Sequence, residues 1–136
     1  MSDPIWMPCA ALVGLTGLVW VKMYADRLGE MRRKGVDPQA LARARDTAAL
    51  ERTAAAENFR NLFEVPVLFY VLCIGLAANG GSSPGFVAAA WAYVGLRALH
   101  SLIHVTYNRV VHRFLAYVAS TLLLFGMWIA FFLRIG

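Results

Sequence analysis

The sequence predicts an all-α integral membrane protein, a bundle of four transmembrane helices, and three observations lead to this fold class. Hydrophobic side chains make up 60% of the 136 residues and charged ones only 15%, whereas soluble domains average roughly 45–50% and about 25%. The apolar residues gather in four segments almost free of charge, each near the roughly 20 residues that a helix needs to cross a bilayer. All eight acidic residues precede residue 65, so the rest of the chain carries no negative side chain. The predicted spans are residues 5–25, 62–78, 86–105 and 114–133.

The first span is interpreted as a retained transmembrane helix and not as a cleaved signal peptide. The stretch before Ile5 lacks the positive charges of a signal peptide, and the apolar run continues to Ala25 without a convincing cleavage site. Its one charged residue, Lys22, lies where its side chain can reach the membrane surface. The following residues 26–46 carry six Arg or Lys side chains and are interrupted at Gly35, which predicts a basic loop.

The second helix is expected to begin outside the membrane and to bend inside it. Strong helix formers follow Pro38, with Asp37 as the N-cap and Pro38 at the first helical position. Because the apolar part covers only residues 62–78, the preceding stretch ENFRNLFE must supply the opening turns at the membrane boundary. Pro66 has no backbone N–H, so it predicts a kink beside Glu64.

The charges in the connections predict the orientation of the spans. The connection NGGSSPG at residues 79–85 is uncharged and turn-like, whereas the connections after the first and third spans are basic. The positive-inside rule therefore places those two loops in the cytoplasm and both termini on the other side. We expect one domain, residues 1–136, surrounded by lipid in the inner (cytoplasmic) membrane. The net charge of +5 does not indicate nucleic-acid binding, because the basic residues lie in loops beside apolar spans.

Polar and ionisable side chains recur near and within the last three spans, where they are energetically unfavourable and mark a functional site or a paired network. They form one stripe on each helix at helical spacing, and the alternating helix directions bring the three stripes to the same side of the membrane. Several cations with one carboxylate suit a small anionic ligand that carries an amine. The stripes are Arg60, Asn61 and Glu64 on the second helix, Arg97, His100 and His104 on the third, and Arg109, Arg113 and Tyr117 on the fourth.

Simpler interpretations compete with a ligand site. Arg60 and Glu64, four residues apart, could form only a structural ion pair, and the arginines of the fourth helix could only follow the positive-inside rule. The HxxxH spacing of His100 and His104 suits a metal ion. No acidic residue follows Glu64, however, so we favour hydrogen-bonded histidines and no metal.

The two cysteines, Cys9 and Cys73, each lie within an apolar segment. Thiols in such places more often pack as small hydrophobic groups than form a bridge. No structural disulfide is therefore expected, and neither cysteine is assigned to the site.

Three motifs resemble the MAPEG family, the membrane-associated proteins of eicosanoid and glutathione metabolism, in a bacterial-type form. They are RNLFEVP at residues 60–66, RALH at 97–100 and NRVVHR at 108–113. The resemblance covers the chain from about Arg52 to Leu133 and, more loosely, the first span. It implies a homotrimer of four-helix subunits that binds glutathione near the cytoplasmic side, between helices of neighbouring subunits.

The resemblance also implies roles for individual residues. Arg60 and Asn61 would contact the glutathione tripeptide, and Glu64 would meet its γ-glutamyl ammonium. Arg113 would be the catalytic residue that holds the sulfur as thiolate, and Tyr117 would face the ligand one turn later. The remaining residues assigned to glutathione binding are Arg97, His100, His104 and Arg109.

The chain departs from the family pattern at three positions. His104 stands where several family enzymes have tyrosine, and Glu57 stands where some members have arginine. Phe114 follows Arg113 where a small hydroxyl residue can occur. An acidic Glu57 weakens the attraction for a carboxylate, and Phe114 removes a possible hydrogen-bond donor.

The chemistry of glutathione fits this set of charges. At neutral pH it carries two carboxylates and one ammonium, and its thiol, with a pKa near 8.5, becomes more reactive when a guanidinium stabilises the thiolate. We therefore expect a glutathione-dependent transferase or peroxidase acting on lipophilic electrophiles. The alternative is a non-catalytic structural or accessory subunit of a membrane complex. A third, weaker interpretation makes His100 and His104 metal or haem ligands of a redox subunit.

Overall fold

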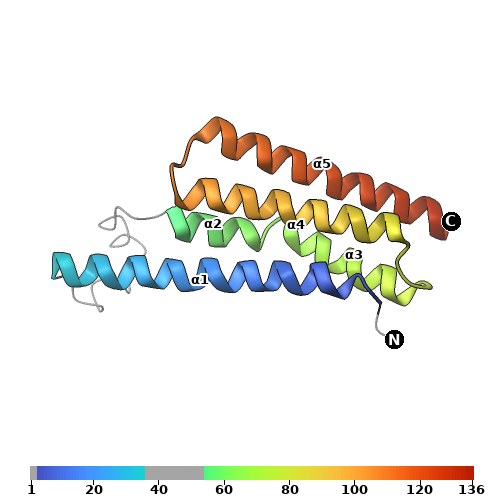
Figure 1. Cartoon of the computed structure of the whole chain (residues 1–136), viewed down its shortest axis with the longest axis horizontal. Helices are drawn as coiled ribbons and strands as arrows, with labels where there is room; N and C mark the ends of the chain where they lie inside the picture. The colour runs from blue at the N-terminus through green and yellow to red at the C-terminus, as the bar shows by residue number, and fades with distance from the viewer. Residues whose placement is uncertain (1–2, 36–53) are drawn as a thin grey trace.

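Five helices make up the part of the chain that the computed structural model describes, residues 3–35 and 54–136 (Figure 1). They are α1 (Trp6–Lys34), α2 (Ala54–Leu62), α3 (Pro66–Ala78), α4 (Pro84–Val105) and α5 (Val110–Ile135). α1, α4, α5 and the α2–α3 pair are each long and apolar enough to cross a membrane. The predicted all-α membrane bundle of four spans is therefore confirmed.

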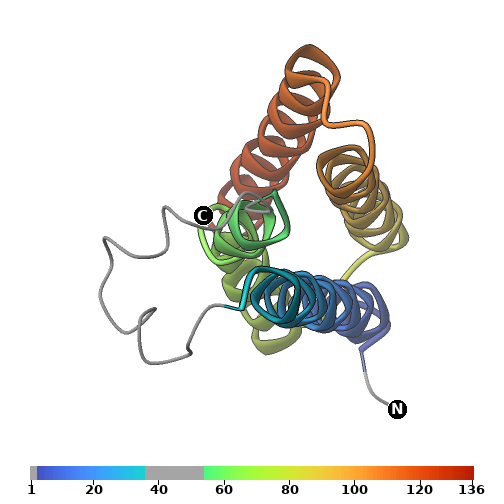
Figure 2. The same ribbon diagram turned by 90° about the vertical axis from the view of Figure 1, so that its left-hand side faces the viewer.

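The four spans alternate in direction. Both chain ends lie at one end of the bundle, which we call the termini end (Figure 1). The last turn of α1, the start of α2 and the α4–α5 turn lie at the opposite end, which we call the turn end. α1 packs against α2 and α4, and α4 packs against α5, an arrangement seen along the bundle in Figure 2. The basic residues that flank the first and third connections therefore gather at the turn end.

Helix α1 is longer than the sequence predicted. It continues to Lys34, so the prediction of a loop beginning after Ala25 is wrong for its first nine positions, residues 26–34. Two ion pairs with helical i,i+4 spacing stabilise this extension: Lys22 Nζ to Asp26 Oδ2 at 2.7 Å and Lys34 Nζ to Glu30 Oε1 at 2.9 Å.

The end of α1 is set by Gly35, whose φ of 61° is left-handed and whose N–H donates to the Met31 carbonyl. Glycine adopts this conformation without a steric penalty. The rest of the predicted loop, residues 36–46, and the predicted helix start at Asp37 and Pro38 lie outside the described residues.

The kink predicted at Pro66 is a complete break between two helices. α2 ends at Leu62, and α3 begins at Pro66, where a missing N–H removes no helical hydrogen bond. Tight turns bridge the gap, with Phe63 N–H donating to the Arg60 carbonyl (2.9 Å) and Val67 N–H donating to that of Glu64 (3.2 Å). Glu64 therefore lies in a non-helical segment. In the described part of the chain no salt bridge joins it to Arg60, so the i,i+4 pair considered from the sequence does not form.

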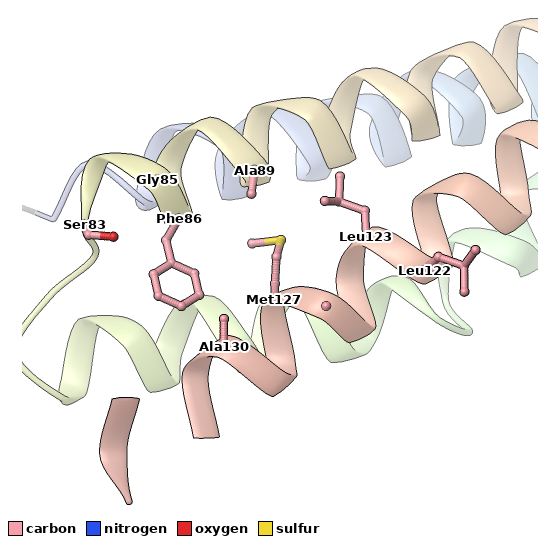
Figure 3. A pocket seen from close by; sticks show the side chains of 9 residues that line it. Ser83, Gly85, Phe86, Ala89, Leu122, Leu123, Met127 and Ala130 are labelled. Atoms are coloured by element: carbon pink, nitrogen blue, oxygen red, sulfur yellow. The ribbon is translucent and has the colours of Figure 1, made fainter. Parts of the chain in front are cut away.

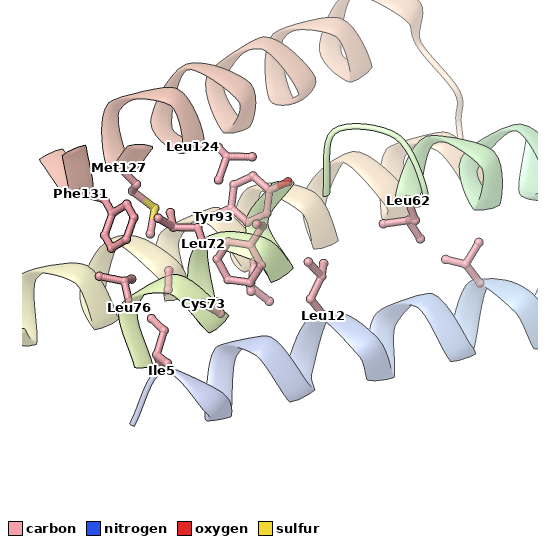
Figure 4. Close-up of a cluster of buried hydrophobic side chains, with 14 residues drawn as sticks. Ile5, Leu12, Leu62, Leu72, Cys73, Leu76, Tyr93, Leu124, Met127 and Phe131 are labelled. Carbon is pink, nitrogen blue, oxygen red and sulfur yellow. The ribbon is translucent and has the colours of Figure 1, made fainter. Parts of the chain in front are cut away.

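Apolar side chains from every span meet in one core, much of which is visible in Figure 4. The rings of Phe69 on α3 and Tyr93 on α4 stack with centroids 4.7 Å apart. α3 and α5 approach closely at Gly75, where an added Cβ would lie 3.1 Å from Phe131 Cζ. Cys73 is completely buried in this core, and Cys9 packs against it, so the predicted packing of both cysteines as small hydrophobic groups is confirmed.

The outward faces of the helices are also apolar. Only 22% to 39% of the most apolar part of each span is buried within the chain, and large side chains such as Leu18, Leu122 and Leu133 are mostly exposed. In water such a surface would aggregate. It is suited to lipid acyl chains or to neighbouring subunits.

A polar clasp joins three distant segments at the termini end. The Asp3 carboxylate accepts hydrogen bonds from the Ile5 N–H (2.9 Å), the Ser82 N–H (2.7 Å) and the Ser82 hydroxyl. Arg134 Nη1 donates to the Gly81 carbonyl at 2.7 Å. Gly81 has a φ of +86°, and a Cβ there would lie 3.0 Å from Asp3 Oδ2, so this position requires glycine.

Acid is expected to open this clasp. The Ser82 hydroxyl, the Ile5 N–H and the Ser82 N–H lower the pKa of Asp3 below its usual 3.8. The stabilisation is therefore complete above about pH 4 and is lost as the pH falls through the lower pKa of the folded protein. Thermal unfolding in detergent between pH 7 and pH 3 should show a loss of stability that is reduced in Asp3→Asn. Equal pH dependence in both proteins would contradict a role for this carboxylate.

Candidate functional site

A small polar cavity opens in the turn-end half of the bundle, between the α2–α3 break and the start of α5. Its volume is about 190 Å³. Five of the nine residues that the sequence assigned to the site lie around it, and Phe114 adds one of its two apolar walls. The lining residues are Asn61, Glu64, His100, Val110, Arg113, Phe114 and Tyr117.

Arg113 is held in place before any ligand arrives. Its Nη1 lies 2.8 Å from Asn108 Oδ1 and 3.1 Å from His104 Nε2. A guanidinium can only donate, so His104 accepts at Nε2 and carries its proton on Nδ1. Asn108 lies in the α4–α5 turn with a φ of 47°, a conformation that asparagine tolerates better than most residues. This turn thereby orients the arginine.

The backbone of Arg113 positions the ring of His100. Its Nδ1 lies 3.0 Å from the Arg113 carbonyl, which can only accept, so the proton is on Nδ1. Its Nε2 is then an acceptor, and it is buried with no hydrogen-bond partner among residues 3–35 and 54–136. The Tyr117 ring lies beside it, with centroids 5.8 Å apart. This nitrogen is available to a donor group of a ligand.

Arg97 supports the cavity from behind and does not line it. The side chain is completely buried, and Nη2 donates to the Asn61 carbonyl at 2.9 Å. Asn61 is in the last turn of α2, where carbonyls lack helical partners and a cation interacts favourably with the helix dipole. The guanidinium also lies 5.5 Å from the centroid of the Tyr117 ring. The α2–α3 break thus creates the acceptor that positions Arg97 against α5.

Arg97 and Glu64 keep charge and hydrogen-bonding capacity that a ligand at the cavity could use. Nε and Nη1 of Arg97 have no partner among the described residues, and Glu64 is close enough to act on Arg97 electrostatically. Glu64 itself is exposed at the cavity and is the one acidic residue that lines it in the part of the chain that the structure describes. An anion near Arg97 and a cation near Glu64 would each find an opposite charge there.

The remaining two of the nine residues, Arg60 and Arg109, do not line the cavity. Both side chains are exposed. Helical spacing placed them on the same stripes as the lining residues. The break after Leu62 and the extended backbone of Arg109, with φ −71° and ψ 116°, interrupt the helical geometry on which that expectation depended.

Two polar residues that the sequence analysis did not single out stabilise the α2–α4 contact. The Ser101 hydroxyl donates to Asn58 Oδ1 at 3.2 Å, and both residues are buried. Asn58 lies one turn before Leu62, which is also buried, so the inward face of α2 could have revealed it. Glu57, one of the departures from the family pattern, approaches His104 Nε2 at 3.9 Å.

No group of three or more His, Cys, Asp or Glu side chains capable of holding a metal ion occurs within residues 3–35 and 54–136. The rings of His100 and His104 stand edge to face with centroids 5.7 Å apart. One nitrogen of each is engaged by Arg113. In this structure the two histidines therefore act as hydrogen-bond partners of Arg113.

Apolar grooves accompany the polar cavity. One of about 480 Å³ lies between α1 and the α2–α3 break, lined by aromatic and small side chains that include Trp20, Phe59 and Phe63. Another of about 510 Å³ lies between α4 and α5 at the termini end, where Phe86 and Met127 form part of its wall (Figure 3). The first groove shares the break that carries Glu64, whereas the second lies far along the bundle from the polar cavity.

Comparison with known families identifies the family of the chain. The model of the MAPEG family matches residues 5–133, which include nearly all of the four spans and the whole lining of the cavity. The chain belongs to the MAPEG family. No curated protein and no solved structure matches it significantly. Within this MAPEG chain, the motifs RNLFEVP, RALH and NRVVHR supply every polar lining residue except Tyr117.

Proposed function

We propose that this MAPEG protein binds glutathione in the polar cavity and uses its thiolate to conjugate lipophilic electrophiles or to reduce lipid hydroperoxides. The observation that carries the proposal is the convergence of Asn61, Glu64, His100, Arg113 and Tyr117 on one cavity. These residues come from three spans and are brought together only by the fold. Membership of the family supports the same activity class.

The ammonium group and the sulfur of glutathione each have a complementary group in the cavity. Glu64 is the anion that meets the γ-glutamyl ammonium, and Asn61 offers an amide beside it. Arg113 holds the sulfur as thiolate, since a cation favours the charged form of a thiol. His100 Nε2 and Tyr117 line the wall between these two charges. Electrophiles dissolved in the bilayer would reach the sulfur from the lipid side, where Phe114 and Val110 are exposed.

The size of the cavity supports a site that a neighbouring subunit completes, and the assembly proposed here is the homotrimer that the resemblance to the family implies. Ligand pockets usually enclose about 300–1,000 Å³, whereas this cavity encloses about 190 Å³ within one chain. The exposed Arg60 and Arg109 then remain available for the glutathione carboxylates at a subunit boundary. The positive-inside rule puts the turn end, and with it the site, at the cytoplasmic side of the inner membrane.

Isothermal titration calorimetry of the detergent-solubilised protein with glutathione tests this proposal. We expect saturable binding with a Kd in the range of roughly 1 μM to 1 mM, where enzyme substrate constants commonly lie. Cysteinylglycine, which lacks the γ-glutamyl group, should bind far more weakly. Absence of glutathione binding by correctly folded protein would favour the alternative of a non-catalytic structural or accessory subunit.

A further inference from the structure

The groove between α4 and α5 at the termini end is large enough to hold a ligand, and the proposed glutathione chemistry does not use it. It encloses about 510 Å³, whereas ligand pockets usually enclose about 300–1,000 Å³. Figure 3 shows Phe86 extending from α4 toward α5 and Met127 extending from α5 toward α4. Among the described residues, Ser83 supplies its one polar side chain. The interior of the groove therefore suits a hydrocarbon chain.

The groove ends at a positive charge. On α5, Leu122, Gly126 and Ala130 line the groove at intervals of four residues, which places them in one row along the helix. Arg134 continues this row by one more interval of four and is exposed. Its Nη1 donates to the Gly81 carbonyl at 2.7 Å, in the connection that leads into the α4 wall of the groove. The guanidinium therefore lies at the mouth of the groove.

This mouth carries one charge of each sign. Asp3 accepts hydrogen bonds from the N–H and the hydroxyl of Ser82, the residue next to Gly81. With the Ile5 N–H it accepts three hydrogen bonds among the described residues, and a carboxylate can accept about four. Arg134 has several N–H groups besides the one that meets Gly81. A headgroup with a phosphate and an ammonium would complement both side chains.

The length of the groove suits an acyl chain of one leaflet. From Leu122 to Ala130, α5 rises about 12 Å at 1.5 Å per residue, and half of the hydrocarbon core of a bilayer is about 15 Å thick. The chain itself leaves this space open, because a Cβ added at Gly126 would meet no heavy atom within 4 Å. Small side chains also permit close contact with a neighbouring helix, but a helix would not account for the charges at the mouth.

We propose that the groove binds one phosphatidylethanolamine molecule from the leaflet around the termini end. An acyl chain lies between α4 and α5, the phosphate meets Arg134, and the ammonium lies toward Asp3. The lipid fills space that the protein leaves open and joins the second connection to the end of α5. This site is separate from the polar cavity and does not depend on glutathione.

Photolabelling of the full chain in detergent tests the proposal. The probe is phosphatidylethanolamine with a diazirine in one acyl chain, and peptide mass spectrometry locates the label after illumination. We expect label on Phe86, Ala89 and Met127 in excess of that on Leu18 and Leu133, which are exposed outside the groove. Unlabelled phosphatidylethanolamine should compete, and diacylglycerol with the same chains should not. Even labelling of all exposed apolar residues, or equal competition by diacylglycerol, would overturn the proposal.

Two variants test the groove and its mouth separately. Gly126→Leu places a side chain in the groove without touching the rest of the chain, and it should abolish the groove labelling. Gly95→Leu is the matched control, because this exposed α4 glycine also has no heavy atom within 4 Å of an added Cβ and does not line the groove. Arg134→Gln keeps a donor for Gly81 but removes the charge, so the half-saturating lipid concentration should rise about threefold to tenfold.

The unfolding temperature of each variant is measured beside the labelling. Labelling that persists in Gly126→Leu, or falls equally in Gly95→Leu, would contradict the groove as the site. If Phe86, Ala89 and Met127 stay unlabelled in the native chain, a neighbouring subunit covers the groove and the proposal is wrong. Glutathione is absent throughout, so failure of these tests leaves the proposed function untouched.

Discussion

Replacing Arg113 by alanine is expected to lower the thiolate fraction of bound glutathione at neutral pH by about tenfold or more. His104 and Asn108 hold the Arg113 guanidinium at the cavity before the ligand binds. The side chain therefore needs little rearrangement to stabilise the thiolate. Losing it should return the pKa of the bound thiol toward about 8.5, and each unit corresponds to about 1.4 kcal/mol. The near-ultraviolet absorbance of the thiolate, followed across pH, measures this shift, and turnover with a lipophilic electrophile should fall in parallel.

Two controls separate thiolate stabilisation from simple binding. An S-alkylated glutathione has no ionisable thiol, so its affinity should change little in Arg113→Ala. Arg33→Ala removes an exposed arginine at the end of α1, at the same end of the bundle, and should leave the thiol titration as it is in the native protein. An equal loss of affinity for both ligands would show that Arg113 binds a carboxylate, and its catalytic role would be wrong.

Arg113→Ala also removes the donor that satisfies His104 Nε2 and Asn108 Oδ1. Leaving a buried acceptor unsatisfied costs about 1–3 kcal/mol, so the unfolding temperature must be measured beside the titration. Arg113→Lys keeps a positive charge and one donor in the same place. Partial recovery of the thiolate in this variant is expected if charge at the sulfur is what matters.

The fold was largely predictable from sequence because membrane spans depend on composition over long windows. Hydropathy placed all four spans, and alternating direction followed from their number. The boundaries were less predictable. Residues 26–34 remained helical because charge does not end a helix, and ion pairs at helical spacing support it; the left-handed Gly35 ends it. The break before Pro66 is complete, and Leu62 and Pro66 on its two sides are both buried, a tertiary feature that hydropathy does not report.

The site was predictable as a set of side chains but not as an arrangement. Helical spacing indicates which residues share a face, and it identified Glu64, His100 and Arg113 as neighbours. Helical spacing does not say whether a guanidinium lines a cavity, as that of Arg113 does, or packs outside its lining, as that of Arg97 does. Arg97 turns toward the Asn61 carbonyl because the break leaves that carbonyl free, and a break of this kind is a tertiary feature.

Glu64→Gln is the second substitution expected to have a large effect, and it acts on binding. Glutamine keeps the shape of the side chain and its acceptor oxygen but removes the negative charge that Glu64 contributes to the cavity lining. A hydrogen bond to a charged group contributes about 1.5–3 kcal/mol. The Kd for glutathione should therefore rise by roughly tenfold to a hundredfold, as measured by calorimetry. Because Glu64 is exposed in a non-helical segment, the unfolding temperature should hardly change.

A matched ligand makes the test specific to the ammonium group. Glutaryl-cysteinylglycine has the same skeleton as glutathione without the amine, so it should bind the native protein and Glu64→Gln about equally. The two proteins and two ligands form a thermodynamic cycle, whose coupling energy isolates the contact between carboxylate and ammonium. If both ligands lose affinity by the same factor, Glu64 acts on the thiol or on the shape of the α2–α3 break. In that case the γ-glutamyl group must lie elsewhere, and the exposed Arg60 and Arg109 would be the next positions at which to seek the tripeptide.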